Sequence, residues 1–132
     1  MPIITGWATL FCATLFIALT FRVIAARRAS GVAMGDGGDE TLLRRMRGQA
    51  NAAEQMPITL IALLVTEISA GSGWLLGLFA LIFCAGRLAH GIAFGWMMHN
   101  MPLRVSGMIA STSGTGLILI HLAFALLFGM GS

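Results

Sequence analysis

Four long apolar segments, separated by short polar connections, dominate the pattern of the chain. They cover about residues 3–26, 50–70, 74–98 and 105–130. A helix needs roughly 20 apolar residues to cross a bilayer, and each segment meets that length. The pattern therefore predicts an all-α integral membrane protein, in which residues 1–132 form a single four-helix, four-span domain.

The three connections differ in length. Gly71, Ser72 and Gly73 leave almost no room between the second and third segments, which predicts a tight helical hairpin. Pro102 marks a short turn before the fourth segment. The remaining connection, about residues 27–46, contains the stretch GVAMGDGGDE, which is typical of turns and loops.

Composition supports the membrane interpretation. The chain is 58% hydrophobic and only 10% charged, whereas soluble globular domains carry about 25% charged residues. Its basic residues are all arginines, and they flank the apolar segments instead of forming a solvated basic face, so a nucleic-acid-binding surface is not favoured. No metal-binding spacing of cysteines or histidines occurs, so no metal site is expected. The absence of lysine and the abundance of Ala, Gly and Arg indicate a bacterial source of high GC content, and the expected location is then the bacterial inner membrane.

The arginines predict the orientation. Six lie outside the apolar segments: Arg27, Arg28, Arg44, Arg45, Arg47 and Arg104. All six belong to the first and third connections, and the second connection and both termini have none. Positive residues prefer the cytoplasmic side, so both termini are expected outside the cytoplasm. The first segment is longer than the roughly 7–15 apolar residues of a signal peptide, so we expect a retained helix.

The second segment opens with an unusual polar face. Arg47, Asn51 and Glu54 stand at positions i, i+4 and i+7, which share one side of a helix. Gln49 lies among them. At about 1.5 Å of rise per residue, Glu54 lies roughly 10 Å inward from Arg47. Ionisable groups inside a span are costly, and they mark a functional site by default.

A matching face occurs on the third segment. Arg87, His90 and Phe94 stand at i, i+3 and i+7. His90 lies roughly 12 Å inward from residue 98 on a helix that runs the other way, so the two polar faces meet at similar depth. A structural ion pair between Glu54 and Arg87 is one interpretation. The alternative is an anion-binding pocket, because the cluster holds more cationic donors than its carboxylate can use.

Other residues within the segments suggest structural roles. Glu67 lies near the opposite interface and is expected to be solvated there. Packing residues are expected at Gly107, Ala110, Ser111 and Gly114, because small residues allow close approach of membrane helices. Arg22 is expected to extend its charged end toward the loop side.

Several motifs resemble one membrane family. RGQANAAEQMP has the form R-x-Q-x-N-x-x-E-x-x-P found at the start of the second helix in the leukotriene-forming branch of the MAPEG family, the membrane-associated proteins in eicosanoid and glutathione metabolism. VIAARRA resembles the end of that branch's first helix. GRLAHGIAF resembles the third helix of the prostaglandin-E-forming branch, and MPLR resembles the start of the fourth helix. The motifs keep their order over nearly the whole chain.

This resemblance implies a homotrimer with glutathione bound between neighbouring subunits near the cytoplasmic side. It implies glutathione binding by Arg27, Arg47, Gln49, Asn51, Glu54, Arg87, His90 and Phe94. It also implies that a guanidinium activates the thiol, with Arg104 as the first candidate and Arg28 as the second. The chain departs from the family pattern in having no tyrosine: Phe94 and Gln55 occupy two usual tyrosine positions, and Val105 replaces a serine.

The expected function is therefore that of a membrane glutathione transferase or peroxidase-like protein, with a lipophilic second substrate from the bilayer. Arginines suit the two carboxylates of glutathione, and Glu54 suits its ammonium. A guanidinium near the thiol favours the reactive thiolate. Two alternatives remain: a small four-span transporter, although the first segment lacks the carboxylate that such antiporters use, and a non-catalytic membrane protein of the same fold.

Overall fold

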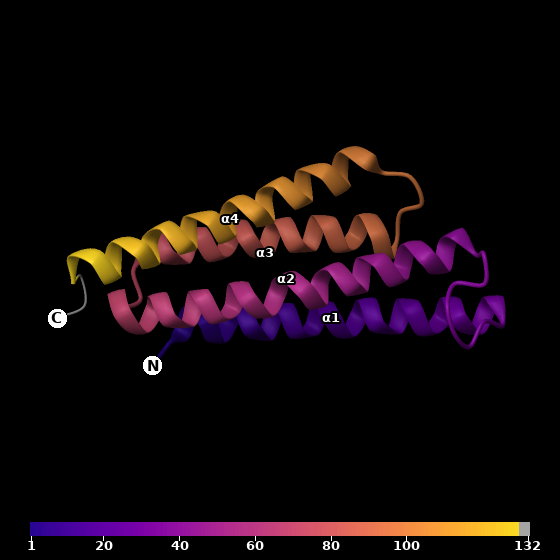
Figure 1. The fold of residues 1–132 in the computed structure, drawn as a ribbon, viewed down its shortest axis with the longest axis horizontal. Helices are drawn as coiled ribbons and strands as arrows, with labels where there is room; N and C mark the ends of the chain where they lie inside the picture. Colours follow the sequence, from indigo (N-terminus) through magenta and orange to yellow (C-terminus); the bar gives the residue numbers. More distant parts are fainter. Residues whose placement is uncertain (130–132) are drawn as a thin grey trace.

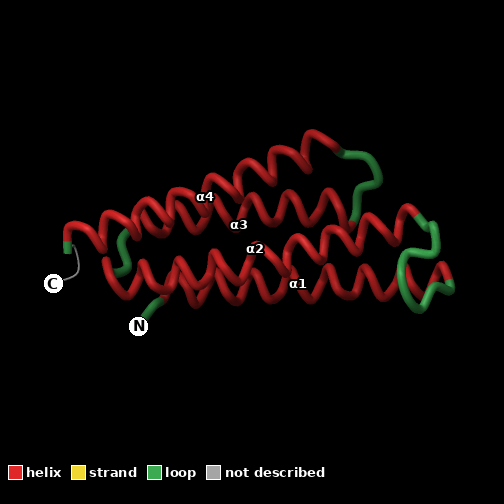
Figure 2. The backbone as a smooth tube through the Cα atoms, viewed as in Figure 1, coloured by secondary structure: helices red, strands yellow, loops and turns green. Residues whose placement is uncertain are grey.

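The computed structural model describes residues 1–129 as four α-helices and their connections. The helices are α1 (Ile3–Ser30), α2 (Glu40–Ala70), α3 (Trp74–Gly95) and α4 (Met101–Phe128). They lie side by side along one long axis (Figures 1 and 2). Each is long and apolar enough to cross a bilayer. The all-α, four-helix prediction is confirmed.

The helix boundaries differ from the predicted ones, mainly at the arginine-rich end. α2 begins at residue 40 instead of 50, so the long connection covers only residues 31–39. Its start is capped by the Asp39 carboxylate, which accepts a hydrogen bond of 2.8 Å from the Leu42 amide. α4 likewise begins at residue 101 instead of 105, with Asn100 accepting from the Leu103 amide at 3.0 Å. Hydropathy marks only the lipid-embedded part of a helix, whereas these caps set its true start.

The other two boundary differences are smaller. α1 continues to residue 30 instead of 26, and Gly31 ends it in the left-handed conformation with φ of 69°. α3 ends at residue 95 instead of 98. The predicted end of the fourth segment, residue 130, lies outside the described residues.

The two ends of the bundle differ in character. The described ends of the chain and the α2–α3 turn lie together at one end, and the 31–39 connection and the α3–α4 turn lie at the other (Figure 1). Because the arginines outside the apolar segments belong to these two connections and their flanks, they gather at one end of the molecule.

α3 and α4 form the closest helix pair. A Cβ added at Gly86 would lie 2.3 Å from the Ser111 backbone nitrogen, and one added at Gly114 would lie 2.6 Å from the Phe83 backbone nitrogen. Gly107 is buried in the same α3–α4 contact, which we call the glycine seam. Since lipid removes the hydrophobic drive for helix association, close backbone packing of small residues must supply it. The predicted packing role of the small residues on α4 is confirmed for these positions.

Glu67 joins α1 and α2 at the opposite end of the bundle through a set of hydrogen bonds, which we call the Glu67 clasp. Its carboxylate accepts hydrogen bonds from the backbone amides of Ile4 and Thr5, at 2.9 and 2.8 Å, and from the Thr5 hydroxyl at 2.7 Å. The Ser72 hydroxyl donates a fourth bond of 2.6 Å. The prediction of a solvated Glu67 is wrong, because only 4% of the residue is exposed. The first-turn amides of α1 have no partners within their own helix, and a carboxylate from α2 supplies them.

The glycine seam gives a direct test of packing. Gly114→Ala should lower the free energy of unfolding by roughly 1–3 kcal/mol, because the added methyl group has no space. Gly116→Ala is the matched control on the same helix, since a Cβ there meets nothing within 4 Å. It should be neutral or stabilising by up to about 1 kcal/mol. Thermal unfolding in detergent measures both, and equal effects would contradict the close α3–α4 contact.

The Glu67 clasp gives a second test. Glu67→Ala should cost at least about 2 kcal/mol of unfolding free energy, because hydrogen bonds to a charged group contribute roughly 1.5–3 kcal/mol and the α1 amides would lose their partner. Glu40→Ala is the control, since its carboxylate is exposed and only faces His99 across 3.8 Å. A Glu67 variant as stable as the control in the same thermal assay would show that water replaces the clasp.

Candidate functional site

The centre of the polar region is Arg87 on α3, of which 1% is exposed. One terminal nitrogen donates to the Gln55 side-chain oxygen at 2.9 Å. The other donates to the Asn51 side-chain oxygen at 2.9 Å and to His90 Nδ1 at 3.1 Å. Its Nε has no hydrogen-bond partner among the described residues. Arg87 is therefore a buried cation held by neutral side chains.

The structure contradicts an ion pair between Glu54 and Arg87. Within residues 1–129, no carboxylate lies within ion-pair distance of Arg87. Glu54 instead stands exposed on the outer side of α2. The reason lies in helix geometry: neighbouring residues point about 100° apart around a helix of 3.6 residues per turn, so with Gln55 directed at Arg87 the adjacent side chain, Glu54, is directed away from it.

The contacts of Arg87 fix which atoms its partners can offer elsewhere. A guanidinium has five N–H donors and no acceptor, so both partners must present acceptors to it. Asn51 presents its oxygen, which leaves its NH2 group for other partners. His90 presents Nδ1, so its neutral ring carries the proton on Nε2. Each residue thereby retains a donor that is not used by Arg87.

Those donors border a cavity of about 380 Å³ between α2, α3 and α4. Its lining consists of Arg47, Asn51, His90, Phe94, Arg104, Val105, Met108 and Ile109. Figure 1 shows α4 tilting away from α2 toward its first residues, at the end where this cavity lies. The polar lining comprises two guanidinium groups, an amide and an imidazole, with no carboxylate. A lining that offers mainly donors and positive charge suits an anionic ligand.

Phe94 organises the wall of the cavity. The guanidinium of Arg104 lies 5.3 Å from the centre of its ring and that of Arg44 lies 5.8 Å away, both in cation–π geometry. The His90 ring packs at 4.9 Å with a tilt of 42°. Gly48 on α2 permits this approach, since a Cβ there would lie 2.5 Å from the Phe94 Cβ. The ring therefore holds two arginines near the cavity mouth.

Five of the predicted site residues line this cavity together: Arg47, Asn51, His90, Phe94 and Arg104. Arg87 does not line it. It lies behind the wall and orients Asn51 and His90, so within one chain it is a positioning residue instead of a ligand contact.

The other predicted residues lie elsewhere in the single chain. Gln49 turns toward α1 and donates to the Thr20 hydroxyl at 2.8 Å. Arg27 holds the 31–39 connection, with its shortest bond of 2.9 Å to the Gly35 carbonyl. Arg28 is exposed on α1, a helix that does not contact α4. These side chains are not brought together with the cavity of their own subunit.

Two residues of the site were missed by sequence reasoning. Gln55 was noted only as a replacement for tyrosine, yet its oxygen accepts from Arg87 and its NH2 group contacts the Met108 sulfur at 3.6 Å. Its spacing of four from Asn51 was the signal that could have found it. Arg44, noted only among the loop arginines, reaches Phe94 because α2 begins earlier than predicted.

Comparison with known proteins assigns the family. A family model described as the MAPEG family matches residues 4–124. The chain is also similar to the inner membrane protein YecN of Escherichia coli K12, with 32% identity over 99 residues that cover 75% of this chain and 74% of that protein. YecN of E. coli strain CFT073 matches to the same extent. Together with the four apolar helices, these matches show that the chain belongs to the MAPEG family of membrane proteins.

Proposed function

We propose that the protein is a membrane glutathione transferase or peroxidase-like enzyme that binds glutathione in the α2–α3–α4 cavity. The observation that carries the proposal is the set of hydrogen-bond donors around this cavity. Arg87 lies behind the cavity wall and occupies the acceptor atoms of Asn51 and His90, which leaves their donors for a ligand. A volume of about 380 Å³ lies within the range of small-molecule sites, roughly 300–1,000 Å³. Membership of a family named for glutathione metabolism selects glutathione among possible anions.

Each charged group of glutathione has a suitable partner. Its two carboxylates match Arg47 and Arg104, with the Asn51 NH2 group and the His90 Nε2–H as further donors. Its ammonium needs an acceptor that the cavity lining lacks. Glu54 can supply it, because this residue follows Arg47 and Asn51 on α2 and its carboxylate is exposed.

Association of subunits would complete the site. The exposed side of α2 continues from Glu54 through Ile58, Ile61, Val65 and Ile68, at the three- and four-residue spacing of a helix–helix seam. A homotrimer that covers this side would carry Glu54 into a subunit interface. Gln49, Arg27 and Arg28 stand on the α1 side, so they could reach only the glutathione held by a neighbouring subunit.

The reaction begins with thiol ionisation. A cysteine thiol has an ordinary pKa of about 8.5, and a nearby guanidinium favours the thiolate. Because Phe94 offers no hydroxyl group, this task falls to arginine, and Arg104 lies in the cavity lining. The thiolate then forms an S–C bond with a lipophilic electrophile, which releases its leaving group or takes up a proton. With a hydroperoxide, the thiolate forms an S–O bond with the terminal oxygen as the O–O bond breaks, and the released alkoxide takes up the proton lost by the thiol and leaves as an alcohol. The thiol of a second glutathione then attacks the sulfur of the resulting sulfenic acid, which gives the disulfide and water.

The arrangement also fits an orientation with the arginine-rich end in the cytoplasm and both termini outside it. The cavity lies at this end, because Arg47 and Arg104 line it. It would thus open toward a cytoplasmic supply of glutathione. The location that we propose is the bacterial inner membrane, as for the related E. coli protein.

Replacement of one donor tests the binding proposal. Asn51→Asp keeps an oxygen for Arg87 but exchanges the NH2 donor for negative charge. Glutathione affinity should fall at least tenfold, or about 1.4 kcal/mol, in a titration monitored by thermal stabilisation. Asn100→Asp adds the same charge at the start of α4, where an aspartate also caps a helix, and should retain binding. Equal stabilisation of the unmodified protein by 2-mercaptoethanol, which lacks carboxylates, would contradict an anion site.

Replacement of Arg104 tests the chemistry. With Arg104→Gln, bound glutathione should have a thiol pKa higher by roughly 1–3 units, and its thiolate absorbance at neutral pH should fall. Arg104→Lys should restore much of the thiolate, because it retains the charge. Arg28→Gln is the comparison: a larger effect there would assign thiol activation to Arg28. If glutathione bound to the unmodified protein shows no enhanced thiolate, the enzyme proposal fails and a binding role remains.

A further inference from the structure

A separate groove runs along the bundle between α1 and α3. It has a volume of about 510 Å³ and is lined by Phe11, Thr14, Leu15, Ala18, Leu88, Ile92 and Trp96. It shares no residue with the α2–α3–α4 cavity. Its walls are almost wholly apolar, with Thr14 as the polar residue among them. This groove plays no part in the proposed glutathione chemistry.

One end of the groove carries positive charge. The Arg22 guanidinium lies 5.3 Å from the centre of the Trp96 ring, and its Nε donates to the Gly95 carbonyl at 2.9 Å. The two terminal nitrogens of Arg22 form no hydrogen bond or ion pair within residues 1–129. Arg45 adds a second cation, since it donates to the Arg22 carbonyl at 3.4 Å. Trp96 thus stands between an apolar groove and a pair of arginines.

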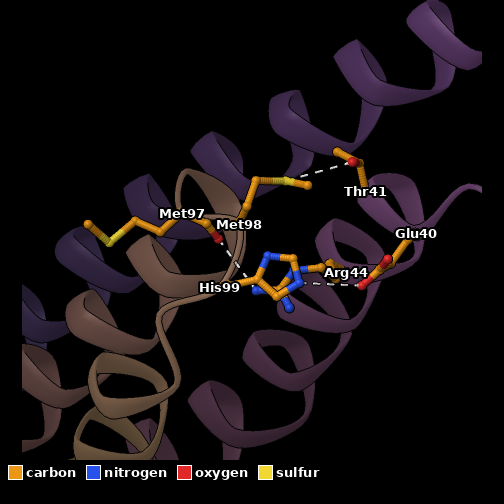
Figure 3. Close-up of polar contacts among 6 residues, drawn as sticks. All are labelled: Glu40, Thr41, Arg44, Met97, Met98 and His99. Carbon is orange, nitrogen blue, oxygen red and sulfur yellow. Dashed lines mark hydrogen bonds and ion pairs between the residues drawn. The ribbon is translucent and has the colours of Figure 1, made fainter.

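A small cleft of about 70 Å³ shares Trp96 with the groove, and Arg44 and Arg45 are among its lining residues. The nearby acidic groups are engaged. Asp39 caps α2 and lies close enough to Arg45 to interact with it. In Figure 3, Glu40 faces His99, while Arg44 donates to the Met97 carbonyl at 3.4 Å. Like Arg44, Arg22 has no carboxylate within ion-pair distance among residues 1–129, and its terminal nitrogens are open to a ligand.

The distance from Arg22 to the far end of the groove matches one leaflet of a bilayer. From Phe11 to Arg22 the helix rises by roughly 16 Å, at about 1.5 Å per residue. Half of a typical hydrocarbon core measures about 15 Å. Trp96 stands at the arginine end, and tryptophan is enriched at the membrane–water interface. An acyl chain with its headgroup at Arg22 would then end near the middle of the membrane.

We propose that the α1–α3 groove is a binding site for an anionic phospholipid of the leaflet that faces the arginine-rich end. One acyl chain lies along the groove, and the phosphate accepts hydrogen bonds from the terminal nitrogens of Arg22, with Arg45 adding attraction. The positive charge of Arg22 and Arg45 favours an anionic headgroup. The apolar groove beside them has room for an acyl chain, which favours a lipid over a free anion. Bound in this way, the lipid bridges α1 and α3 at the end opposite the Glu67 clasp.

The test measures lipid binding to the purified full-length protein by native mass spectrometry from detergent. Palmitoyl-oleoyl phosphatidylglycerol should bind about tenfold or more tightly than phosphatidylethanolamine with the same chains, because charge-assisted hydrogen bonds distinguish the headgroups. Arg22→Gln should remove most of this preference. Ala18→Trp should weaken binding of both lipids by filling the groove, while leaving the contact between Arg22 and Gly95 intact.

Matched controls make the result specific. Arg28→Gln removes the same charge from an exposed position on α1, and Ala25→Trp adds the same bulk at an exposed position outside the groove. Both should bind lipid as the unmodified protein does. Equal binding of the two lipids by the unmodified protein would overturn the proposal without any variant. So would equally tight binding of glycerol phosphate, which would indicate a free-anion site, or a change of oligomer mass in Ala18→Trp, which would make the groove a contact between copies of the chain.

Discussion

The burial of Arg87 is the constraint on which the polar half of the bundle depends. A guanidinium at this depth requires partners, because an unsatisfied cation in a membrane is costly. The chain supplies an amide oxygen from Asn51, another from Gln55, and a ring nitrogen from His90. None of these groups is negative, so the positive charge is solvated without being neutralised. Its field acts on the neighbouring cavity, whose wall includes Asn51 and His90.

Helix packing makes this network possible. Its three partners come from α2 and α3, and the cavity also needs α4, so three backbones must approach one another around one side chain. Gly48 permits contact between α2 and Phe94, while Gly86 and Gly107 permit contact between α3 and α4. At the far end, Glu67 joins α1 to the α2–α3 turn through four hydrogen bonds. The bundle is thus stabilised by two sets of polar contacts, the Arg87 network and the hydrogen bonds of Glu67. Close backbone packing at the glycines joins the helices between these two sets.

Sequence patterns predicted the number, order and approximate position of the helices, because an apolar run of this length has few alternatives. They also predicted that Asn51, His90 and Arg87 would meet, because helical periodicity places them on facing sides. The sequence predictions failed where the charge of a residue was given more weight than its position on the helix. The ion pair between Glu54 and Arg87, one of the two interpretations of the polar cluster, is wrong, because the neighbouring Gln55 has the angular position that meets Arg87. Glu67 was judged by its distance from the membrane centre, whereas its role depends on the first-turn amides of α1, which no pattern within α2 reveals.

Phe94 and Gln55 show how a chain without tyrosine can retain a coherent site. A tyrosine hydroxyl is both donor and acceptor, so it could serve a ligand or a neighbouring side chain. At Phe94 the hydroxyl is absent, and the ring instead supports Arg44 and Arg104 by its face. At Gln55 an amide provides the acceptor that Arg87 needs. The two replacements differ in effect: Phe94 loses a group that both donates and accepts, whereas the Gln55 amide keeps both capacities and uses its oxygen for Arg87. Without a tyrosine hydroxyl, ionisation of a thiol bound here would depend on the arginines and on the neutral donors of Asn51 and His90. Recognition of the carboxylates and activation of the sulfur would then compete for the same few donors.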